Sequence, residues 1–131
     1  MMELSVRPVR SRLERRAFIN FPYRLYHSDR HWIAPLRIDT SHLINPKKNA
    51  FFEHGDIRPF IARGSDGKVV GRIAAIINGM HLKKYNDRVG FFGLFECVDD
   101  EHVENRLLDA AAEWLRGKNL KYMRGPVNPS M

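Results

Sequence analysis

Residues 91–108 read FFGLFECVDDEHVENRLL, and this stretch decides the fold because an apolar strand runs directly into a helix there. The apolar, aromatic run is typical of a strand, which we predict over residues 89–98. Asp99 or Asp100 can then cap a helix whose apolar positions recur at helical spacing. Those positions are Val103, Leu107, Leu108, Ala111 and Leu115. We therefore predict a strand followed at once by a long amphipathic helix that ends near Asn119.

The junction between this strand and this helix is the first candidate site. Free N–H groups and the positive end of the helix dipole make a helix start suitable for phosphate binding. Here Asp99, Asp100 and Glu101 follow one another without a glycine. Side chains restrict the approach of an anion to the backbone, and acids repel it. We therefore interpret the three acids first as a helix cap and only second as catalytic groups.

The N-terminal part of the chain predicts a short strand and two helices. The strand covers residues 4–9. A helix then begins at Ser11, because Ser11 and Glu14 have the spacing of a capping box. Pro22 is expected to kink or divide this helix. A second, short helix is expected over residues 35–44.

A β-hairpin is predicted before the opening stretch. Two β-rich segments, 57–62 and 69–77, surround a turn that contains an Asp-Gly dipeptide. Residues 47–55 are expected to form a loop, and the polar residues 81–88 a crossing to the next strand. A last strand begins at Tyr122. The predicted sheet is therefore mainly antiparallel.

The composition is that of one soluble globular domain, and we expect a cytoplasmic location. The chain has 131 residues, with 44% hydrophobic and 28% charged residues, which is enough for one hydrophobic core. No apolar run approaches the roughly 18 residues of a membrane span, and the N-terminus lacks a secretory signal. The single cysteine, Cys97, cannot form an internal disulfide and is interpreted as a small hydrophobe at a strand end. No membrane partner is expected.

The net charge of +7 is unevenly distributed. A basic first third could attract nucleic acid, an acidic substrate or the phosphates of coenzyme A (CoA), although a solvated helix face is the simpler interpretation. Its arginines are Arg7, Arg10, Arg12, Arg15, Arg16, Arg24, Arg30 and Arg37.

The order of these elements resembles the first two-thirds of the GNAT acyltransferase fold. The segments that carry the resemblance are GRIAAI (71–76), GFFGLFE (90–96), LLDAAAEWL (107–115) and RGPVNPS (124–130). They are similar to a divergent bacterial GNAT-like family of larger proteins. The resemblance implies an α/β (α+β) protein with a mixed, mainly antiparallel sheet flanked by helices. It covers most of residues 1–131, which we interpret as one domain.

The resemblance also implies a CoA-dependent N-acyltransferase that uses acetyl-CoA or another acyl-CoA and no metal. In GNAT proteins the strand before the long helix contacts the pantetheine arm, and the following helix start receives the pyrophosphate. By position, the pantetheine contacts are the N–H groups of Phe95, Cys97 and Val98. The corresponding phosphate contacts are His102, Val103, Asn105 and Arg106. His102 and Glu104 stand where the family pattern has glycines.

Three side chains are candidates for the chemistry itself. Acyl transfer to an amine needs a group that accepts the amine proton, and Glu96, at the end of an apolar strand, is the candidate base. Arg72 is a candidate substrate contact, because strand alternation places it on one face with Val70, Ala74 and Ile76. His81 is a second candidate substrate contact. The six histidines show no zinc spacing.

Two other readings stay open. One keeps the fold without catalysis, as an acyl-CoA sensor or a protein-interaction domain. The other is an RNA-binding module, suggested by Phe91, Phe92 and Phe95 beside a basic helix. Because their spacing departs from the RNA-recognition pattern, nucleic acid is the less favoured partner and the phenylalanines are expected in the core.

The family's later helix and strands, with a tyrosine that often acts as general acid, have no counterpart after Tyr122. The C-terminal strands of the fold are therefore expected to be missing, and the domain incomplete. We expect a fragment, a truncated gene product, or a homodimer that covers the exposed edge of the last strand. The other expected partner is a small-molecule or peptide amine.

Overall fold

The computed structural model describes residues 4–32 and 37–127. The predicted helix start at Pro35 and the segment 128–130 lie outside these residues. The elements are β1 (Ser5–Pro8), α1 (Arg12–Leu25), α2 (Arg37–Leu43), the 3-10 helix η1 (Ala50–Glu53), β2 (Gly55–Arg63), β3 (Val69–Asn78), α3 (Gly79–Tyr85), β4 (Val89–Cys97), α4 (Glu101–Gly117) and β5 (Tyr122–Val127).

The strands form one sheet in the order β1-β2-β3-β4-β5. The first three pairings are antiparallel, and β4 pairs with β5 in parallel. Parallel neighbours need a crossover, and α4 supplies it between β4 and β5. The predicted mixed, mainly antiparallel sheet flanked by helices is confirmed.

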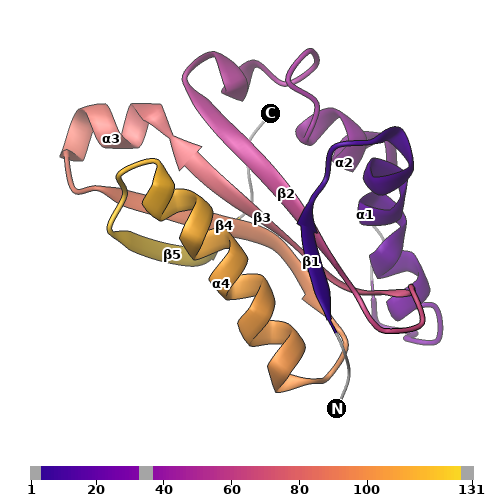
Figure 1. The fold of residues 1–131 in the computed structure, drawn as a ribbon. Coiled ribbons are helices and arrows are strands. Elements are labelled where there is room, and N and C mark those ends of the chain that lie inside the picture. The colour runs from indigo at the N-terminus through magenta and orange to yellow at the C-terminus, as the bar shows by residue number, and fades with distance from the viewer. Residues whose placement is uncertain (1–3, 33–36, 128–131) are drawn as a thin grey trace.

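The two faces of the sheet have separate cores (Figure 1). α1 packs on one face, where Phe18 and Phe21 meet Ile61, Ala74 and Ile76. α4 packs on the other face, where Val103, Leu107 and Ala111 meet Phe60 and Ile73. The apolar stripe predicted for α4 is thus the stripe that is buried. Phe91, Phe92 and Phe95 pack against these cores, as predicted.

Both predicted helix starts are confirmed. Ser11 caps α1 through a capping box in which its side chain accepts from the Glu14 N–H and the Glu14 carboxylate accepts from the Ser11 N–H. Asp100 caps α4 and accepts from the His102 N–H at 2.9 Å. Local side-chain chemistry decides where these helices begin.

The structure corrects three local predictions. Of the two effects predicted for Pro22, a kink or a division, the division is wrong, because α1 continues to Leu25. Residues 79–85 form helix α3, capped by Asn78, where a polar crossing was expected. Val70 packs on the α4 face because the register between β2 and β3 shifts beside it, so it does not share a face with Arg72 and Ala74.

Among the described residues, no helix has both the length and the apolar composition that crossing a bilayer requires.

Candidate functional site

A β-bulge in β4 shapes the candidate site. Ala74 pairs with Gly93 and Arg72 pairs with Glu96, so β4 has one more residue than β3 between these pairs. Leu94, inside the bulge, has a φ of 50°, which is rare for a leucine. Bulges bend a strand and re-aim its side chains, and they are frequent beside active sites. The bend lies immediately before Glu96.

Beyond the bulge, one edge of β4 has no neighbouring strand among the described residues, and we call this stretch the open edge. Within the described residues, β5 accompanies β4 only as far as the pair Gly93–Val127. The Val98 N–H donates to the Val70 carbonyl at 2.9 Å and is used inside the sheet. Because backbone groups alternate along a regular strand, the amide of Cys97 points away from β3, toward the open edge. Phe95 lies within the bulge, where alternation does not fix the direction of its amide, and Val98 does not face the edge.

Glu96 is held by a tyrosine from α1. The Tyr26 hydroxyl, at the C-cap of α1, donates to Glu96 Oε2. This hydrogen bond, together with burial and the negative charge of Glu96, raises the pKa of Tyr26 to about 12. Tyr26 therefore keeps its proton at neutral pH. Among the described residues, Glu96 Oε1 has no hydrogen-bond partner and can accept a proton.

Aromatic rings surround the Tyr26–Glu96 pair. Trp32 stacks on Tyr26 with ring centroids 5.1 Å apart and meets the Tyr23 ring edge-on at 5.3 Å. The Tyr23 hydroxyl is buried and lacks a hydrogen-bond partner in the described part of the chain. Nothing in a single sequence marks Tyr26 as a partner of Glu96, because the two residues meet only through tertiary packing.

Arg72 joins α1 to the bulge. Its Nε donates to the Leu94 carbonyl at 3.1 Å, and its guanidinium donates to the Phe18 carbonyl at 2.9 Å. A residue at position 22 would normally supply the donor for Phe18, but Pro22 has no N–H. Arg72 replaces that donor, which explains why α1 tolerates the proline.

Because Arg72 makes these contacts inside the protein, little of it faces solvent. The residue is 4% exposed, so a bound substrate would contact only a small part of it. Burial lowers the pKa of Arg72 to about 10, although the nearby Glu96 carboxylate opposes the shift. Arg72 therefore remains charged at neutral pH and acts as a positioning residue for the bulge.

The start of α4 offers backbone groups rather than side chains. Val103 is fully buried in the core, and His102 and Asn105 are exposed. The His102 N–H is already used by Asp100. In residues 4–32 and 37–127, the N–H groups of Glu101 and Val103 have no acceptor. These two amides are the ones available to an anion.

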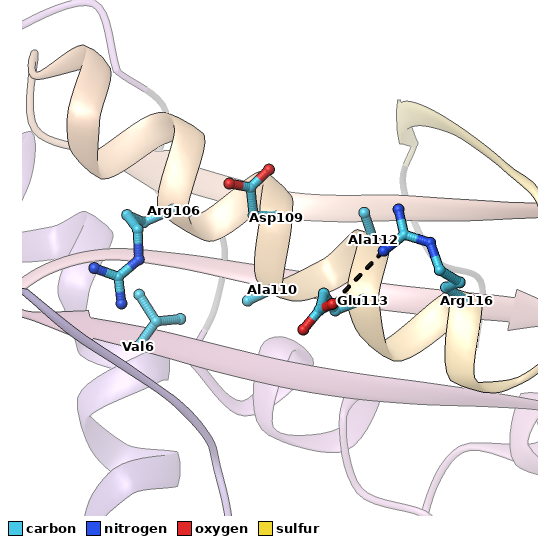
Figure 2. A pocket seen from close by; sticks show the side chains of 7 residues that line it. All are labelled: Val6, Arg106, Asp109, Ala110, Ala112, Glu113 and Arg116. Atoms are coloured by element: carbon cyan, nitrogen blue, oxygen red, sulfur yellow. Dashed lines mark ion pairs between the residues drawn. The ribbon is translucent and has the colours of Figure 1, made fainter.

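Arg106 lies elsewhere. Its side chain lines a cavity of about 460 Å³ between α4 and β1, together with Val6, Asp109 and Glu113. Figure 2 shows the Arg106 guanidinium extending toward Val6, with Glu113 paired to Arg116 at 3.6 Å further along the helix. The structure therefore does not bring the Arg106 side chain to Glu96.

His81 is also distant from Glu96. It lies on α3, hydrogen-bonds the Asp87 carboxylate at 2.9 Å and packs edge-on against Phe91. Phe91 precedes Glu96 by five residues, which is roughly 16 Å along a strand. Desolvation raises the pKa of Asp87, but hydrogen bonds from His81 and the Val89 N–H outweigh it, so the pKa is lowered. His81 and Asp87 thus form a separate pair.

Cys97 has the environment of an unreactive thiol. Burial, followed by the repulsion of nearby carboxylates such as Glu104, raises its pKa to about 11. Thiolates are the reactive form of cysteine, and little of it is present at neutral pH. No group of histidine, cysteine and acidic side chains among the described residues could hold a metal ion.

Comparison with known proteins gives two curated relatives. The chain is 39% identical over 131 residues to the bacterial ceramide synthase of Caulobacter vibrioides, in an alignment that takes in 98% of this chain and 34% of that protein. It is 34% identical over 123 residues to Protein YghO of Escherichia coli K12, with 94% and 31% covered. The chain therefore spans about a third of the length of either relative. No family model matches it.

Solved structures identify the fold. A tandem GNAT protein from the clavulanic acid biosynthesis pathway superimposes with a TM-score of 0.67 at 14% identity, over 98% of this chain and 40% of that protein. A predicted acetyltransferase with acetyl-CoA from Clostridium acetobutylicum gives a TM-score of 0.61 at 10% identity, over 97% and 81%. An aminoglycoside acetyltransferase from a soil metagenomic sample gives 0.62 at 11% identity, over 95% and 78%. The chain has the GNAT fold.

Proposed function

We propose that this chain is the acyl-CoA-binding and proton-accepting part of an N-acyltransferase. The observation that carries the proposal is the edge of β4 that has no partner strand among the described residues, beside the Tyr26–Glu96 pair. Acyl transfer from a thioester needs donors for the carrier and a base for the amine, and this edge has both. The GNAT fold supports the same reading.

Backbone amides hold the acyl-CoA in this proposal. The amides of Phe95 and Cys97 contact the pantetheine arm, and those of Glu101 and Val103 at the start of α4 contact the pyrophosphate. Such contacts do not require glycines, although the acids of the first turn of α4 weaken phosphate binding. We expect modest affinity for that reason. His102, Asn105 and Arg106 have no part in it through their side chains.

Glu96 removes a proton from the attacking amine. Its Oε1 is free to accept, while Tyr26 fixes Oε2. The new C–N bond forms as the C–S bond of the thioester breaks, and the leaving thiolate takes up a proton to become a thiol. Tyr26 positions the carboxylate, since a phenol with so high a pKa is a poor acid for this step.

The name of one relative supports amide formation as the reaction class. That relative is a bacterial ceramide synthase, and a ceramide is the amide of a fatty acid with a long-chain amino alcohol. A long-chain 2-amino-1,3-diol is therefore the first acceptor amine to test, beside a short primary amine. Small-molecule amines are the proposed partners of the site.

Calorimetric titration with acetyl-CoA tests binding, and release of free thiol tests turnover. We expect saturable binding and amine-dependent thiol release. Glu96→Gln should lower turnover on the order of a hundredfold and leave the Kd for acetyl-CoA unchanged, because the proton transfer is lost and the amides remain. Glu53→Gln, an exposed site elsewhere, is the matched charge control. Unaltered turnover in Glu96→Gln would remove Glu96 from the mechanism. Binding without turnover would indicate the sensor alternative.

A substitution at Gly93, on β4, tests whether the β4–β5 edge is the acyl-CoA-binding slot. A Cβ at Gly93 would overlap the Val127 carbonyl oxygen, so Gly93→Ala forces β5 away from β4. We expect weaker acetyl-CoA binding because the two strands define the slot. Gly117→Ala adds the same methyl group where no atom lies within 4 Å, and it should leave binding intact. Equal affinities of the two variants would exclude the β4–β5 edge as the binding site.

A further inference from the structure

A second cavity lies between α1 and α2, on the sheet face opposite α4. It measures about 490 Å³ and is lined by Arg12, Arg15, Arg16 and Arg37, with Ile19 and Asn20 at their side. Residues 12, 15, 16, 19 and 20 follow helical spacing, so they share one face of α1. A face with this spacing normally turns apolar residues toward its neighbour. Here its first two turns carry arginines instead.

Among the described residues, the four arginines have no acidic partner. No carboxylate lines the cavity, and no ion pair involving these arginines occurs in the described part of the chain. Glu14, the acid within the same turns, accepts hydrogen bonds from the N–H groups of Arg10 and Ser11 in the capping box. The positive charge of the cavity therefore stays uncompensated.

Their position on the helix adds to the cost of this arrangement. Arg12, Arg15 and Arg16 lie in the first turns of α1, where the helix dipole disfavours cations. Like charges at spacings of three and four residues also repel each other. Folding alone would favour neutral or acidic residues here. An anion bound between the guanidinium groups removes both costs.

Arg37 is held in place for such a ligand. Its Nε donates to Asn20 Oδ1 at 2.9 Å, and its guanidinium lies 3.7 Å from the centre of the Tyr23 ring. These contacts fix the plane of the group and use one donor. The terminal nitrogens of Arg37 remain for an anion, opposite the arginines of α1. A planar guanidinium binds phosphate oxygens in pairs, which a lysine cannot do.

We propose that the α1–α2 cavity is a binding site for a phosphate group, separate from the acyl-CoA slot. The phosphate can belong to a soluble phosphate ester or to the head group of an anionic lipid, because the recognition chemistry is the same. Four guanidinium groups around one cavity offer several charge-assisted hydrogen bonds to the oxygens of a phosphate monoester or diester. α4 packs on the other face of the sheet (Figure 1). A single phosphate site for acyl-CoA therefore does not explain both the arginines of the α1–α2 cavity and the free amides at the start of α4.

Two probes distinguish the source of the phosphate. The first is calorimetric titration of the 131-residue chain with inorganic pyrophosphate at constant ionic strength. The second is flotation with phosphatidylcholine vesicles that contain or lack phosphatidylglycerol. Saturable binding of pyrophosphate supports a soluble ester. Binding to phosphatidylglycerol vesicles alone supports a lipid head group.

A charge-matched pair of variants tests the site. Arg12→Gln/Arg15→Gln/Arg16→Gln removes three guanidinium groups from the cavity, and we expect about a tenfold or greater loss of binding to whichever probe binds. Arg7→Gln/Arg10→Gln/Arg30→Gln removes the same charge from exposed positions outside the cavity and should change binding little. Circular dichroism confirms the fold of both, and the first variant should gain helix stability.

Three results with these probes and variants would overturn the proposal, and a fourth comes from acetyl-CoA binding. They are absence of binding to both probes, equal weakening in the two variants, and binding to a short RNA but to neither probe. Acetyl-CoA binding should be unaffected in Arg12→Gln/Arg15→Gln/Arg16→Gln. Its loss together with pyrophosphate binding would mean that one site serves both ligands, which also contradicts a separate site. Failure of acetyl-CoA binding in the wild-type chain, with pyrophosphate binding retained, would refute only the proposed acyltransferase.

Discussion

The two faces of the sheet are built from different interactions. On the α4 face, Val103, Leu107 and Ile73 are fully buried among apolar neighbours. On the α1 face, a buried arginine, a β-bulge and a tyrosine–carboxylate pair lie against the core. Apolar packing depends on the volume of the side chains more than on which apolar residue supplies it, whereas polar contacts need particular donors and acceptors. The α4 face therefore stabilises the fold, and the α1 face positions reactive groups.

The largest effect on stability is expected on the α4 face. Leu107→Ala should lower the free energy of unfolding by about 3–5 kcal/mol, because it removes a fully buried side chain and leaves a cavity. Equilibrium unfolding in urea measures this loss. Leu108→Ala, at the adjacent half-buried position, should lose clearly less. Similar losses at both positions would mean that the stripe is not the main support of the sheet.

On the α1 face, loss of a hydrogen-bond donor should lower the free energy of unfolding less than Leu107→Ala does. Arg72→Met should reduce the free energy of unfolding by about 2–3 kcal/mol, since it leaves the Leu94 and Phe18 carbonyls unpaired while keeping most of the volume. Urea unfolding again gives the value.

A second substitution tests the reason for that loss. Pro22→Ala restores a backbone N–H that can donate to the Phe18 carbonyl within α1. In the Arg72→Met background it should recover about 1 kcal/mol, whereas in the wild-type background the carbonyl already has its donor. A double-mutant cycle measures this coupling. Equal effects of Pro22→Ala in both backgrounds would show that Arg72 does not replace the missing N–H.

The sequence alone predicts the parts that follow local rules. The α4 stripe, the Asp100 cap and the Ser11–Glu14 capping box each lie within a few residues of one another, so their spacing is sufficient. Glu96 could be located because a strand end next to a helix start is visible in the sequence.

Local patterns in the sequence do not predict contacts that form only through tertiary packing. Tyr26 and Glu96 are 70 residues apart, and no local pattern pairs them. Arg72 was expected to reach a substrate, but it is buried because α1 and its proline need a donor at that point. The helix α3 begins at a glycine, which local propensity places outside helices, so the sequence predicts a crossing over residues 81–88 instead.

The smallest effect on stability concerns the Tyr26–Glu96 pair and depends on pH. The hydrogen bond to Glu96 raises the pKa of Tyr26 to about 12 from its ordinary value near 10. A raised pKa in the folded state means that the stabilisation is complete below about pH 10 and is lost as pH rises through about 12. Stability should therefore decline in this window. Glu96→Gln removes the charge and the strong acceptor, so the pKa of Tyr26 should fall toward its ordinary value.

Ultraviolet absorbance of tyrosinate during a pH titration measures this shift. Tyr26→Phe should remove the transition of highest pH, and Tyr122→Phe, at a 65% exposed position, should leave it in place. If the highest transition survived in Tyr26→Phe, or kept its midpoint in Glu96→Gln, the pair would not hold its proton as described. With the expected result, Tyr26 stays protonated at neutral pH and keeps its hydrogen bond to Glu96 Oε2. A side chain positioned in this way is what a proton acceptor at the open edge of β4 requires.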